Sequence, residues 1–127
     1  MLATRLAPLG LLATMLFTAA NAPAAPRRFR LGRYDSDAYT LTFDSTGAFR
    51  YMRGQELMVQ GDYVVHDTTI AVTDETGRDA CVGPARNPGT YSWRVVHGAL
   101  WFRTITDPCP DRIRGLADQA WRPHRAH

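Results

Sequence analysis

The chain has 127 residues and a formal net charge of +3, with 45% of its residues hydrophobic and 21% charged. These proportions are those of a globular domain and exclude a disordered or collagen-like chain, and the length suits one domain rather than several. All 15 basic residues are Arg and most alternate with Asp and Glu, which is not the pattern of a polybasic DNA-binding protein.

Residues 1–24 have the features of a secretory leader. Arg5 provides a positive charge, residues 9–20 are mostly apolar, and Ala22 and Ala24 are the small residues expected before a cleavage site. The apolar stretch is shorter than the roughly 20 residues needed to span a bilayer, so we predict a cleaved leader and no membrane span. We therefore expect the mature protein to be periplasmic or secreted, and monomeric.

Residues 25–37 are predicted to form a basic N-terminal arm. Arg27, Arg28, Arg30 and Arg33 lie close together here, directly after the leader. Such an arm is either a solvated tail or a segment that contacts an acidic partner or an anionic surface of the cell envelope.

Apolar and polar residues alternate along most of the chain after the arm, which is typical of strands with one buried face. Turn residues such as Gly47, Asp67 and Gly98 separate the alternating segments. The alternation covers residues 39–43, 49–51, 57–65, 70–72, 91–95 and 100–102. Short strands joined by tight turns predict an all-β antiparallel meander.

A Gly-x-Tyr-x-Val/Trp motif occurs twice, at Gly61 and at Gly89, and each copy leads into a second alternating segment. The repeat predicts that the same hairpin is used twice, and Gly61 is expected to bend its strand.

Residues 111–121 do not show the alternation that is typical of a strand. Apolar residues there fall at helical spacing, but Gly115 and the flanking prolines leave the choice between helix and strand open.

Cys81 and Cys109 are the two cysteines of the chain. In an exported protein two lone cysteines usually pair, and no CxxC motif or neighbouring His indicates a metal or a reactive thiol instead. We predict a disulfide, which would stabilise the fold by roughly 3–4 kcal/mol through the loop that it closes.

Several motifs resemble the short exported lipocalin-like domains of bacteria. The resemblance covers residues 38–122 and is most specific at the Asp107-Pro108-Cys109 turn, which is followed by Arg112, Leu116 and Trp121. Further matches are Leu41-x-Phe43-Asp44-x-x-Gly47-x-Phe49, Gly61-x-Tyr63, Asp74-Glu75-x-Gly77, Gly89-x-Tyr91-x-Trp93 and Leu100. Lipocalins carry Gly-x-Trp on the first strand, where this chain has Gly32-Arg33-Tyr34.

The resemblance implies a lipocalin-like (calycin-type) up-and-down β-barrel of about eight strands at residues 38–122, with a C-terminal tail at residues 123–127. By the same analogy, the segment from Arg112 to Leu116 would be a closing strand. Arg112 and Trp121 would close the barrel, with the guanidinium stacked on Trp121 or Tyr34.

A barrel of this size has room for its own side chains or for one small ligand. The inward faces are rich in aromatic residues, whose hydroxyls could orient an apolar or amphipathic guest. The short strands and bulky rings favour a filled barrel, so a shallow cup at one end is the largest cavity that we expect. The predicted ligand-binding residues are Tyr39, Phe49, Tyr51, Tyr63, Tyr91, Trp93 and Phe102.

No motif indicates catalysis, a metal or a cofactor. Ser residues lie outside any Gly-x-Ser-x-Gly motif, and the adjacent Asp74 and Glu75 are interpreted as turn residues. His66 and His97 lie in predicted turns, and His124 and His127 in the tail, so no zinc site is expected. We predict a binding protein and not an enzyme. A barrel enzyme is a third possibility, because barrels of this kind can host chemistry through a few interior groups.

An alternative function is an envelope protein-interaction module, such as an inhibitor of a protease or another hydrolase. The basic arm or a loop would then enter the cleft of the target. Trp101 lies between two inward residues, so it is predicted to face outward and to mark a contact surface.

Overall fold

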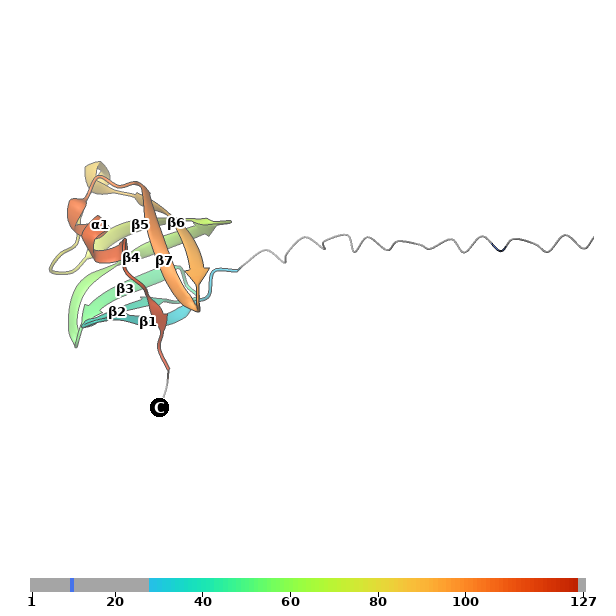
Figure 1. The fold of residues 1–127 in the computed structure, drawn as a ribbon. Coiled ribbons are helices and arrows are strands. Elements are labelled where there is room, and N and C mark those ends of the chain that lie inside the picture. The colour runs from blue at the N-terminus through green and yellow to red at the C-terminus, as the bar shows by residue number, and fades with distance from the viewer. Residues whose placement is uncertain (1–9, 11–27, 126–127) are drawn as a thin grey trace, which may run out of the picture.

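The computed structural model describes residue 10 and residues 28–125 of the chain. Apart from residue 10, the predicted leader lies outside the described residues, as do Arg27 and His127. The described part of the chain forms an eight-stranded antiparallel meander that curls into a nearly closed barrel, and this confirms the predicted fold class (Figure 1). The strands are β1 (Gly32–Ser36), β2 (Tyr39–Phe43), β3 (Ala48–Arg53), β4 (Glu56–His66), β5 (Thr69–Thr76), β6 (Gly89–Val96), β7 (Ala99–Thr106) and β8 (Arg122–Pro123).

Four hairpins of the meander turn through two-residue loops, because β1–β2, β3–β4, β4–β5 and β6–β7 are each separated by two residues. The first residue of each loop has left-handed backbone: Asp37 (φ 49°), Gly54 (φ 58°), Asp67 (φ 53°) and His97 (φ 49°). Asp, His and Gly tolerate this conformation better than most residues. The turn residues therefore fix the register of each hairpin.

The interior of the barrel is an apolar and mainly aromatic core. Every strand from β1 to β7 except β4 places at least one of its inward side chains in this core, as period-two alternation requires. Its fully or almost fully buried members are Tyr34, Leu41, Phe43, Phe49, Ile70, Val72, Tyr91, Trp93, Leu100, Phe102, Leu116, Ala117 and Trp121. The alternation predicted for residues 57–65 fails at its first residue, because Leu57 is half-buried and its neighbour Met58 is buried. The pairing of β3 with β4 changes register beside these residues, between Tyr51 and Met52.

The two glycines of the repeated motif are required by close contacts. A Cβ atom on Gly61 would lie 1.9 Å from the carbonyl oxygen of Thr73, at a point where β4 and β5 change register. A Cβ atom on Gly89 would lie 2.2 Å from Oδ2 of Asp107. Both hairpins of the repeat are present, as β4–β5 and β6–β7.

The barrel begins earlier than the sequence predicted. Residues 25–37 were expected to form an arm, but Gly32–Ser36 is strand β1, which pairs with both β2 and β8. The basic character of Arg33 concealed the strand, since this side chain is on the outer face while Tyr34 is buried. The predicted tail is also shorter, because Pro123 belongs to β8 and the backbone of His124 bonds to Arg33.

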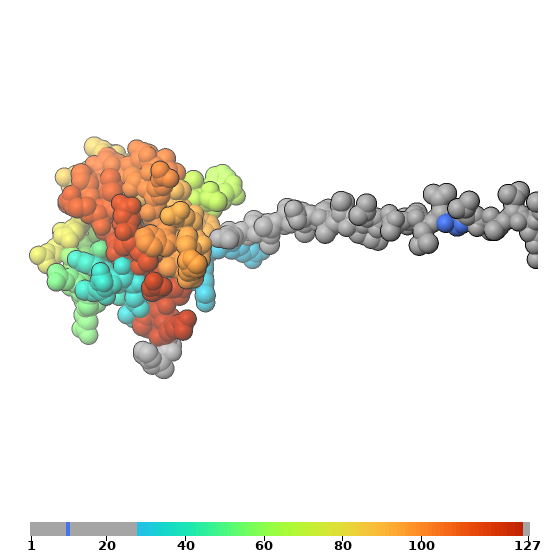
Figure 2. Space-filling view, in the orientation of Figure 1, coloured from blue at the N-terminus to red at the C-terminus, as the bar shows by residue number. Residues whose placement is uncertain are grey.

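Trp121 lies at the seam where the last strand meets β7. Its backbone exchanges two hydrogen bonds of 2.8 Å with Leu100, and its indole donates to the carbonyl of Leu116 at 3.0 Å. Because β8 also pairs with β1, this short segment links the two edges of the sheet. Figure 2 shows the red C-terminal segment between orange atoms, the colour of β7, and cyan atoms, the colour of the β1–β2 hairpin.

Residues 110–116 form a helix, α1 (Pro110–Leu116), so the closing strand implied by the resemblance is wrong. Pro110 occupies the start of the helix, where its missing N–H costs nothing, and Asp111 lies in the first turn, where a negative charge is favourable. Leu116 and Ala117 enter the core. A short 3₁₀ turn, Pro84–Arg86, lies between β5 and β6. Neither helix in the described part of the chain is long and apolar enough to cross a membrane.

The two ends of the barrel are covered differently. Phe29, from the segment before β1, packs edge-to-face on Phe43 and Trp93, with ring centroids 5.0 and 5.3 Å apart. The hydroxyl of Tyr63 and the indole of Trp93 bond to nearby turn carbonyls at this end. Helix α1 covers the opposite end, as Figure 1 shows. The segment predicted as an arm therefore helps to close the barrel.

Cys81 and Cys109 form the predicted disulfide, with Cα atoms 6.4 Å apart and 28 positions between them in the chain. Cys81 lies in the segment after β5, and Cys109 immediately precedes α1, so the bond joins these two places in the fold. It therefore ties the helix to the barrel wall.

We expect the double substitution Cys81→Ala and Cys109→Ala to lower the free energy of unfolding by roughly 3–4 kcal/mol, because the unfolded chain regains the freedom of the closed loop. Urea unfolding of both proteins measures the difference. A reductant should destabilise the natural protein by a similar amount and leave the variant unchanged. Equal stability of the two oxidised proteins would contradict the prediction.

Candidate functional site

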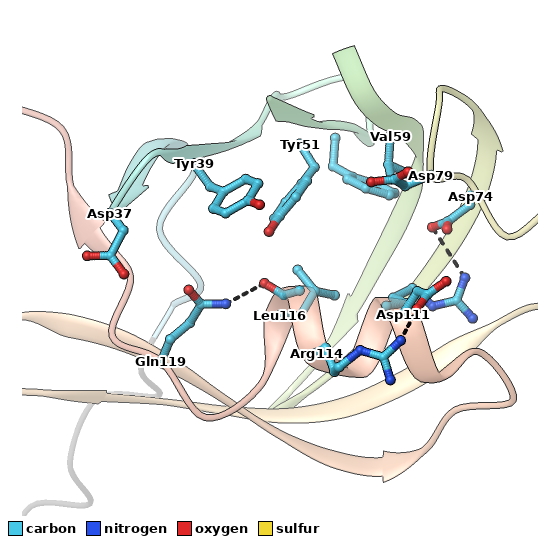
Figure 3. A pocket seen from close by; sticks show the side chains of 13 residues that line it. Asp37, Tyr39, Tyr51, Val59, Asp74, Asp79, Asp111, Arg114, Leu116 and Gln119 are labelled. Carbon is cyan, nitrogen blue, oxygen red and sulfur yellow. Dashed lines mark hydrogen bonds and ion pairs between the residues drawn. The ribbon is translucent and has the colours of Figure 1, made fainter. Parts of the chain in front are cut away.

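A cavity of about 400 Å³ opens between α1 and the sheet, at the end of the barrel opposite Phe29 (Figure 3). It lies at the end of the barrel that α1 covers, and the sequence led us to expect a shallow cup at one end. Phe49, Val59 and Leu116 give it an apolar floor. The remaining lining residues are Asp37, Tyr39, Tyr51, Asp74, Asp79, Asp111, Arg112, Arg114, Gly115 and Gln119.

Tyr39 and Tyr51 form one wall of the cavity. Their rings are stacked, with centroids 5.1 Å apart and planes 25° apart, and Tyr51 also packs edge-to-face on Trp121. Figure 3 shows both hydroxyls directed toward the space in front of α1. Among the described residues, neither hydroxyl has a hydrogen-bond partner. Burial, with smaller contributions from Tyr39 and Asp79, raises the pKa of Tyr51 to about 12, so this hydroxyl is a donor at neutral pH.

Other polar groups at the cavity are already engaged. Gln119 donates to the carbonyl of Gly115 and accepts from the hydroxyl of Ser36 at 2.8 Å. Arg114 pairs with Asp111 on the exposed face of the same helix. These contacts leave the two tyrosine hydroxyls, together with the carboxylates of Asp37 and Asp79, as the polar groups open to a ligand.

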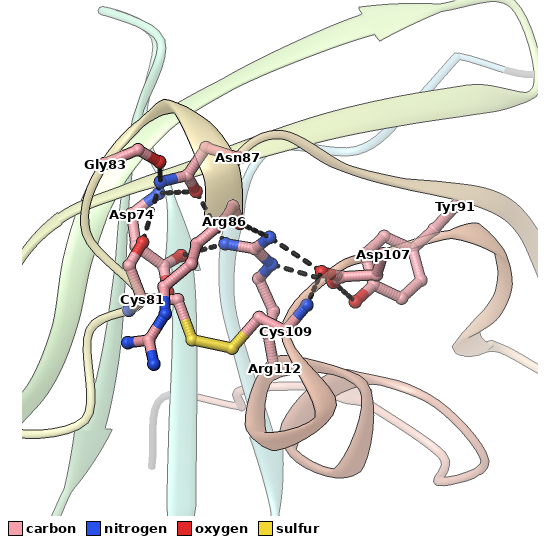
Figure 4. A network of polar contacts seen from close by, with 9 residues as sticks. All are labelled: Asp74, Cys81, Gly83, Arg86, Asn87, Tyr91, Asp107, Cys109 and Arg112. Carbon is pink, nitrogen blue, oxygen red and sulfur yellow. Dashed lines mark hydrogen bonds and ion pairs between the residues drawn. A yellow bond between two sulfur atoms is a disulfide. The ribbon is translucent and has the colours of Figure 1, made fainter.

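A buried network anchors α1 beside the cavity, and its centre is Arg112 (Figure 4). The guanidinium donates to both carboxylate oxygens of Asp107, at 2.8 and 2.7 Å, in the two-pronged geometry that suits Arg. It also donates to the side chain of Asn87 at 2.7 Å and to the carbonyl of Arg86 at 2.6 Å. Asp74 contacts it from the other side at 3.2 Å.

The partners of Arg112 are held in turn by the segments around them. Asp107 accepts from the hydroxyl of Tyr91 and from the backbone of Cys109, and Asp74 accepts from the backbone of Cys81 at 2.9 Å. The network thus joins β5, the segment after it, the end of β7 and α1. Burial alone would raise the pKa of Asp107, but its hydrogen bonds, above all that from Arg112, hold the pKa below its ordinary value. In Tyr91, burial and the bond to Asp107 raise the pKa of the hydroxyl.

Of the seven predicted ligand-binding residues, the structure brings three to the cavity: Tyr39, Phe49 and Tyr51. The other four have different places. Tyr91, Trp93 and Phe102 are buried in the packed core. Tyr63 is half-buried, and its hydroxyl donates to the carbonyl of Asp44 at the opposite end of the barrel.

Arg112 does not have the contact that the resemblance implied for it. We expected its guanidinium to stack on Trp121 or Tyr34, but carboxylates and a carbonyl take up its donors. Asp74, interpreted as a turn residue, lies within β5 and is buried in the same network. Asp74 and Arg112 are 38 positions apart in the sequence, so strand alternation does not predict their contact. One signal was available, since Asp74 continues the inward series of Ile70 and Val72.

Of the features named for a protein-interaction role, Arg28, Arg30 and Arg33 are exposed, whereas Trp101 is not. Trp101 was predicted to be an exposed aromatic, but it is half-buried. Arg33 lies in β1 and contacts Asp35 at 3.4 Å, and Arg27 lies outside the described residues. In the described part of the chain, no group of three or more His, Cys, Asp or Glu residues could hold a metal ion.

No known family model, curated protein or solved structure matches this chain. The structure shows the barrel, but no match supports membership of the lipocalin-like family, which stays a prediction.

We expect Asp107→Asn to lower the free energy of unfolding by about 3 kcal/mol at pH 7, because it removes a charge that compensates the buried Arg112. Since the pKa of Asp107 in the folded protein is lowered, its contribution is fully present above about pH 4 and is lost as the pH falls through the folded pKa. Urea unfolding between pH 7 and pH 2 should show the two proteins converging in acid.

Asp111→Asn is the matched control, because Asp111 also pairs with an Arg but lies 69% exposed on α1. This substitution should change the free energy of unfolding by less than about 0.5 kcal/mol. Equal losses in the two variants, or a loss in Asp107→Asn that is the same at every pH, would contradict the assignment.

Proposed function

We propose that the protein binds a small amphipathic molecule non-covalently in the cavity between α1 and the sheet, without altering it chemically. The observation that carries this proposal is the pair of stacked tyrosines, whose hydroxyls have no partner in the described part of the chain and face a cavity of about 400 Å³. This volume lies within the usual range of small-molecule pockets, which are mostly apolar with a few polar groups that set orientation.

The balance of lining groups supports an amphipathic guest. Its apolar part would contact Phe49, Val59 and Leu116, where burial of apolar surface contributes about 25 cal/mol per Å². Its polar part would bond to the hydroxyls of Tyr39 and Tyr51. Neither hydroxyl is among the buried atoms that lack a partner, so both can bond to water in the open cavity. A ligand bond would replace that water bond and would contribute mainly to specificity.

We further propose that the protein acts outside the cytoplasm, in the periplasm or after secretion. The predicted leader at residues 1–24 and the disulfide between Cys81 and Cys109 support this location, because disulfides persist in oxidising compartments. The alternative role, inhibition of a hydrolase through an arm or a loop, stays a prediction and has less support. Trp101 is half-buried and Arg33 lies in a strand.

Two conservative substitutions separate binding from folding. We expect Tyr51→Phe to weaken binding of a neutral amphipathic probe, 4-phenylbutanol, by about fivefold and to leave stability unchanged, because the hydroxyl that it removes has no protein partner. Tyr63→Phe is the control. It should lower the free energy of unfolding by about 1 kcal/mol, through loss of the bond to Asp44, and leave binding unchanged.

Titration of the probe followed by NMR, together with urea unfolding, measures both quantities. Absence of any saturable binding to the natural protein would overturn the proposed function. Equal weakening of binding by the two variants would contradict the location of the site.

Gly115 gives a second test, because it lies within α1 and lines the cavity. A Cβ atom there would lie 3.4 Å from the hydroxyl of Tyr51. We expect Gly115→Ala to raise the free energy of unfolding by up to about 1 kcal/mol, since Ala favours the helix, while the added methyl group narrows the cavity and weakens binding of 4-phenylbutanol. Unchanged affinity in the folded variant would show that the probe binds elsewhere.

A further inference from the structure

We propose that the cavity selects organic cations, so that its ligand is an amphipathic molecule with an ammonium or similar positive group. This inference rests on the proposed function and specifies the class of ligand. It is derived from the distribution of charge around the cavity, which differs in sign from that of the whole chain.

The charged residues that line the cavity are four Asp and two Arg, in a chain whose net charge is +3. Both arginines are already compensated. Arg114 pairs with Asp111, and Arg112 is shared between Asp74 and Asp107. Within the described residues, Asp37 and Asp79 form no ion pair. Arg78, which pairs with Glu56, also interacts electrostatically with Asp79, so the charge of Asp79 is partly compensated whereas that of Asp37 is not. A ligand in the cavity therefore meets a net negative charge.

The buried network adds to this negative charge. Two carboxylates, those of Asp74 and Asp107, share the single guanidinium of Arg112. The Asp74 side chain is only 2% exposed, and its Oδ1 atom has the ion-pair contact with Arg112 but no hydrogen bond. Asp74 also lines the cavity, so its negative charge acts on a ligand there, while its Oδ1 atom itself stays buried against Arg112. Electrostatic interactions are stronger in such a partly dry site than in bulk water.

The position of the aromatic wall also suits a cation. Figure 3 shows Asp37 beside Tyr39 at one end of the tyrosine pair, and Asp79 beside Val59 at the other. The hydroxyl oxygens of Tyr39 and Tyr51 point into the cavity and can accept hydrogen bonds from an ammonium group. The negative charge of Asp79 interacts with the hydroxyl of Tyr51 and contributes to its raised pKa. A cationic group placed near the rings would thus have a carboxylate on either side.

A metal ion is a poorer fit than an organic cation. Within the described residues, the carboxylates that line the cavity do not converge into a group of three that could hold a metal. The floor formed by Phe49, Val59 and Leu116 is apolar and would leave a small hydrated ion without ligands. A molecule with one charged end and an apolar body satisfies both parts of the cavity.

The test uses three probes of similar size: 4-phenylbutylammonium, 4-phenylbutanol and 4-phenylbutyrate. NMR titration of the purified protein at low and high salt gives their relative affinities. We expect the ammonium to bind about tenfold more tightly than the alcohol, the carboxylate to bind most weakly, and the difference to shrink at high salt because of screening.

Substitutions at Asp37 and Asp79 locate the effect. Asp37→Asn and Asp79→Asn should each weaken binding of the ammonium by about two- to fivefold and leave binding of the alcohol unchanged. Asn tolerates the left-handed backbone of residue 37, so the turn is retained. Asp67→Asn is the matched control, because Asp67 starts an equivalent two-residue turn (φ 53°) and does not line the cavity. It makes the same change in net charge and should not alter the preference.

The outcomes distinguish the two proposals. Preference for the ammonium that is reduced by the cavity variants, but not by Asp67→Asn, supports the inference. Equal binding of all three probes, tighter binding of the carboxylate, or an equal effect of the control variant overturns cation selection and leaves the proposed cavity in place. Failure of all three probes to bind overturns the proposed function, and this inference with it.

Discussion

The contact between the Arg112 guanidinium and the Asp107 carboxylate is the interaction on which the arrangement of the site depends. Both side chains are buried, and the pair is bonded at two points and supported by Asn87, Asp74 and Tyr91. A buried ion pair costs desolvation energy, so it is retained only where each remaining donor and acceptor finds a partner. Here the partners come from four separate segments, and satisfying them leaves a single position for α1.

That position explains why the barrel is filled along most of its length and open at one end. The helix is tied at its start by the disulfide and by Arg112, and the chain after it is tied by the backbone bonds between Trp121 and Leu100. Gly115, between these two anchors, has no side chain to fill the space in front of Tyr51. The anchors therefore hold α1 across the end of the barrel while the space beneath it stays open.

Much of the barrel could be predicted from sequence because strand alternation is a local property. The meander, the repeated hairpin and the cysteine pair follow from residues close in sequence or from the compartment. Strand β1 was missed because the charge of Arg33 and its neighbours resembles that of a solvated arm, although Tyr34 is buried. Helix α1 was ambiguous because it has seven residues, one of them Gly115, and so short a segment carries too weak a periodicity. The partners of Arg112 could not be predicted, since they are brought together only by the closed fold.

The aromatic contacts of Phe29 with Phe43 and Trp93 close the end of the barrel opposite α1. Under the proposed function, a ligand beneath α1 would enter and leave through the same opening. A substitution that narrows this opening without contacting the ligand would lower the association and dissociation rate constants by the same factor and leave the equilibrium constant unchanged. Under the proposed function, residence time and affinity could therefore be adjusted separately in this architecture.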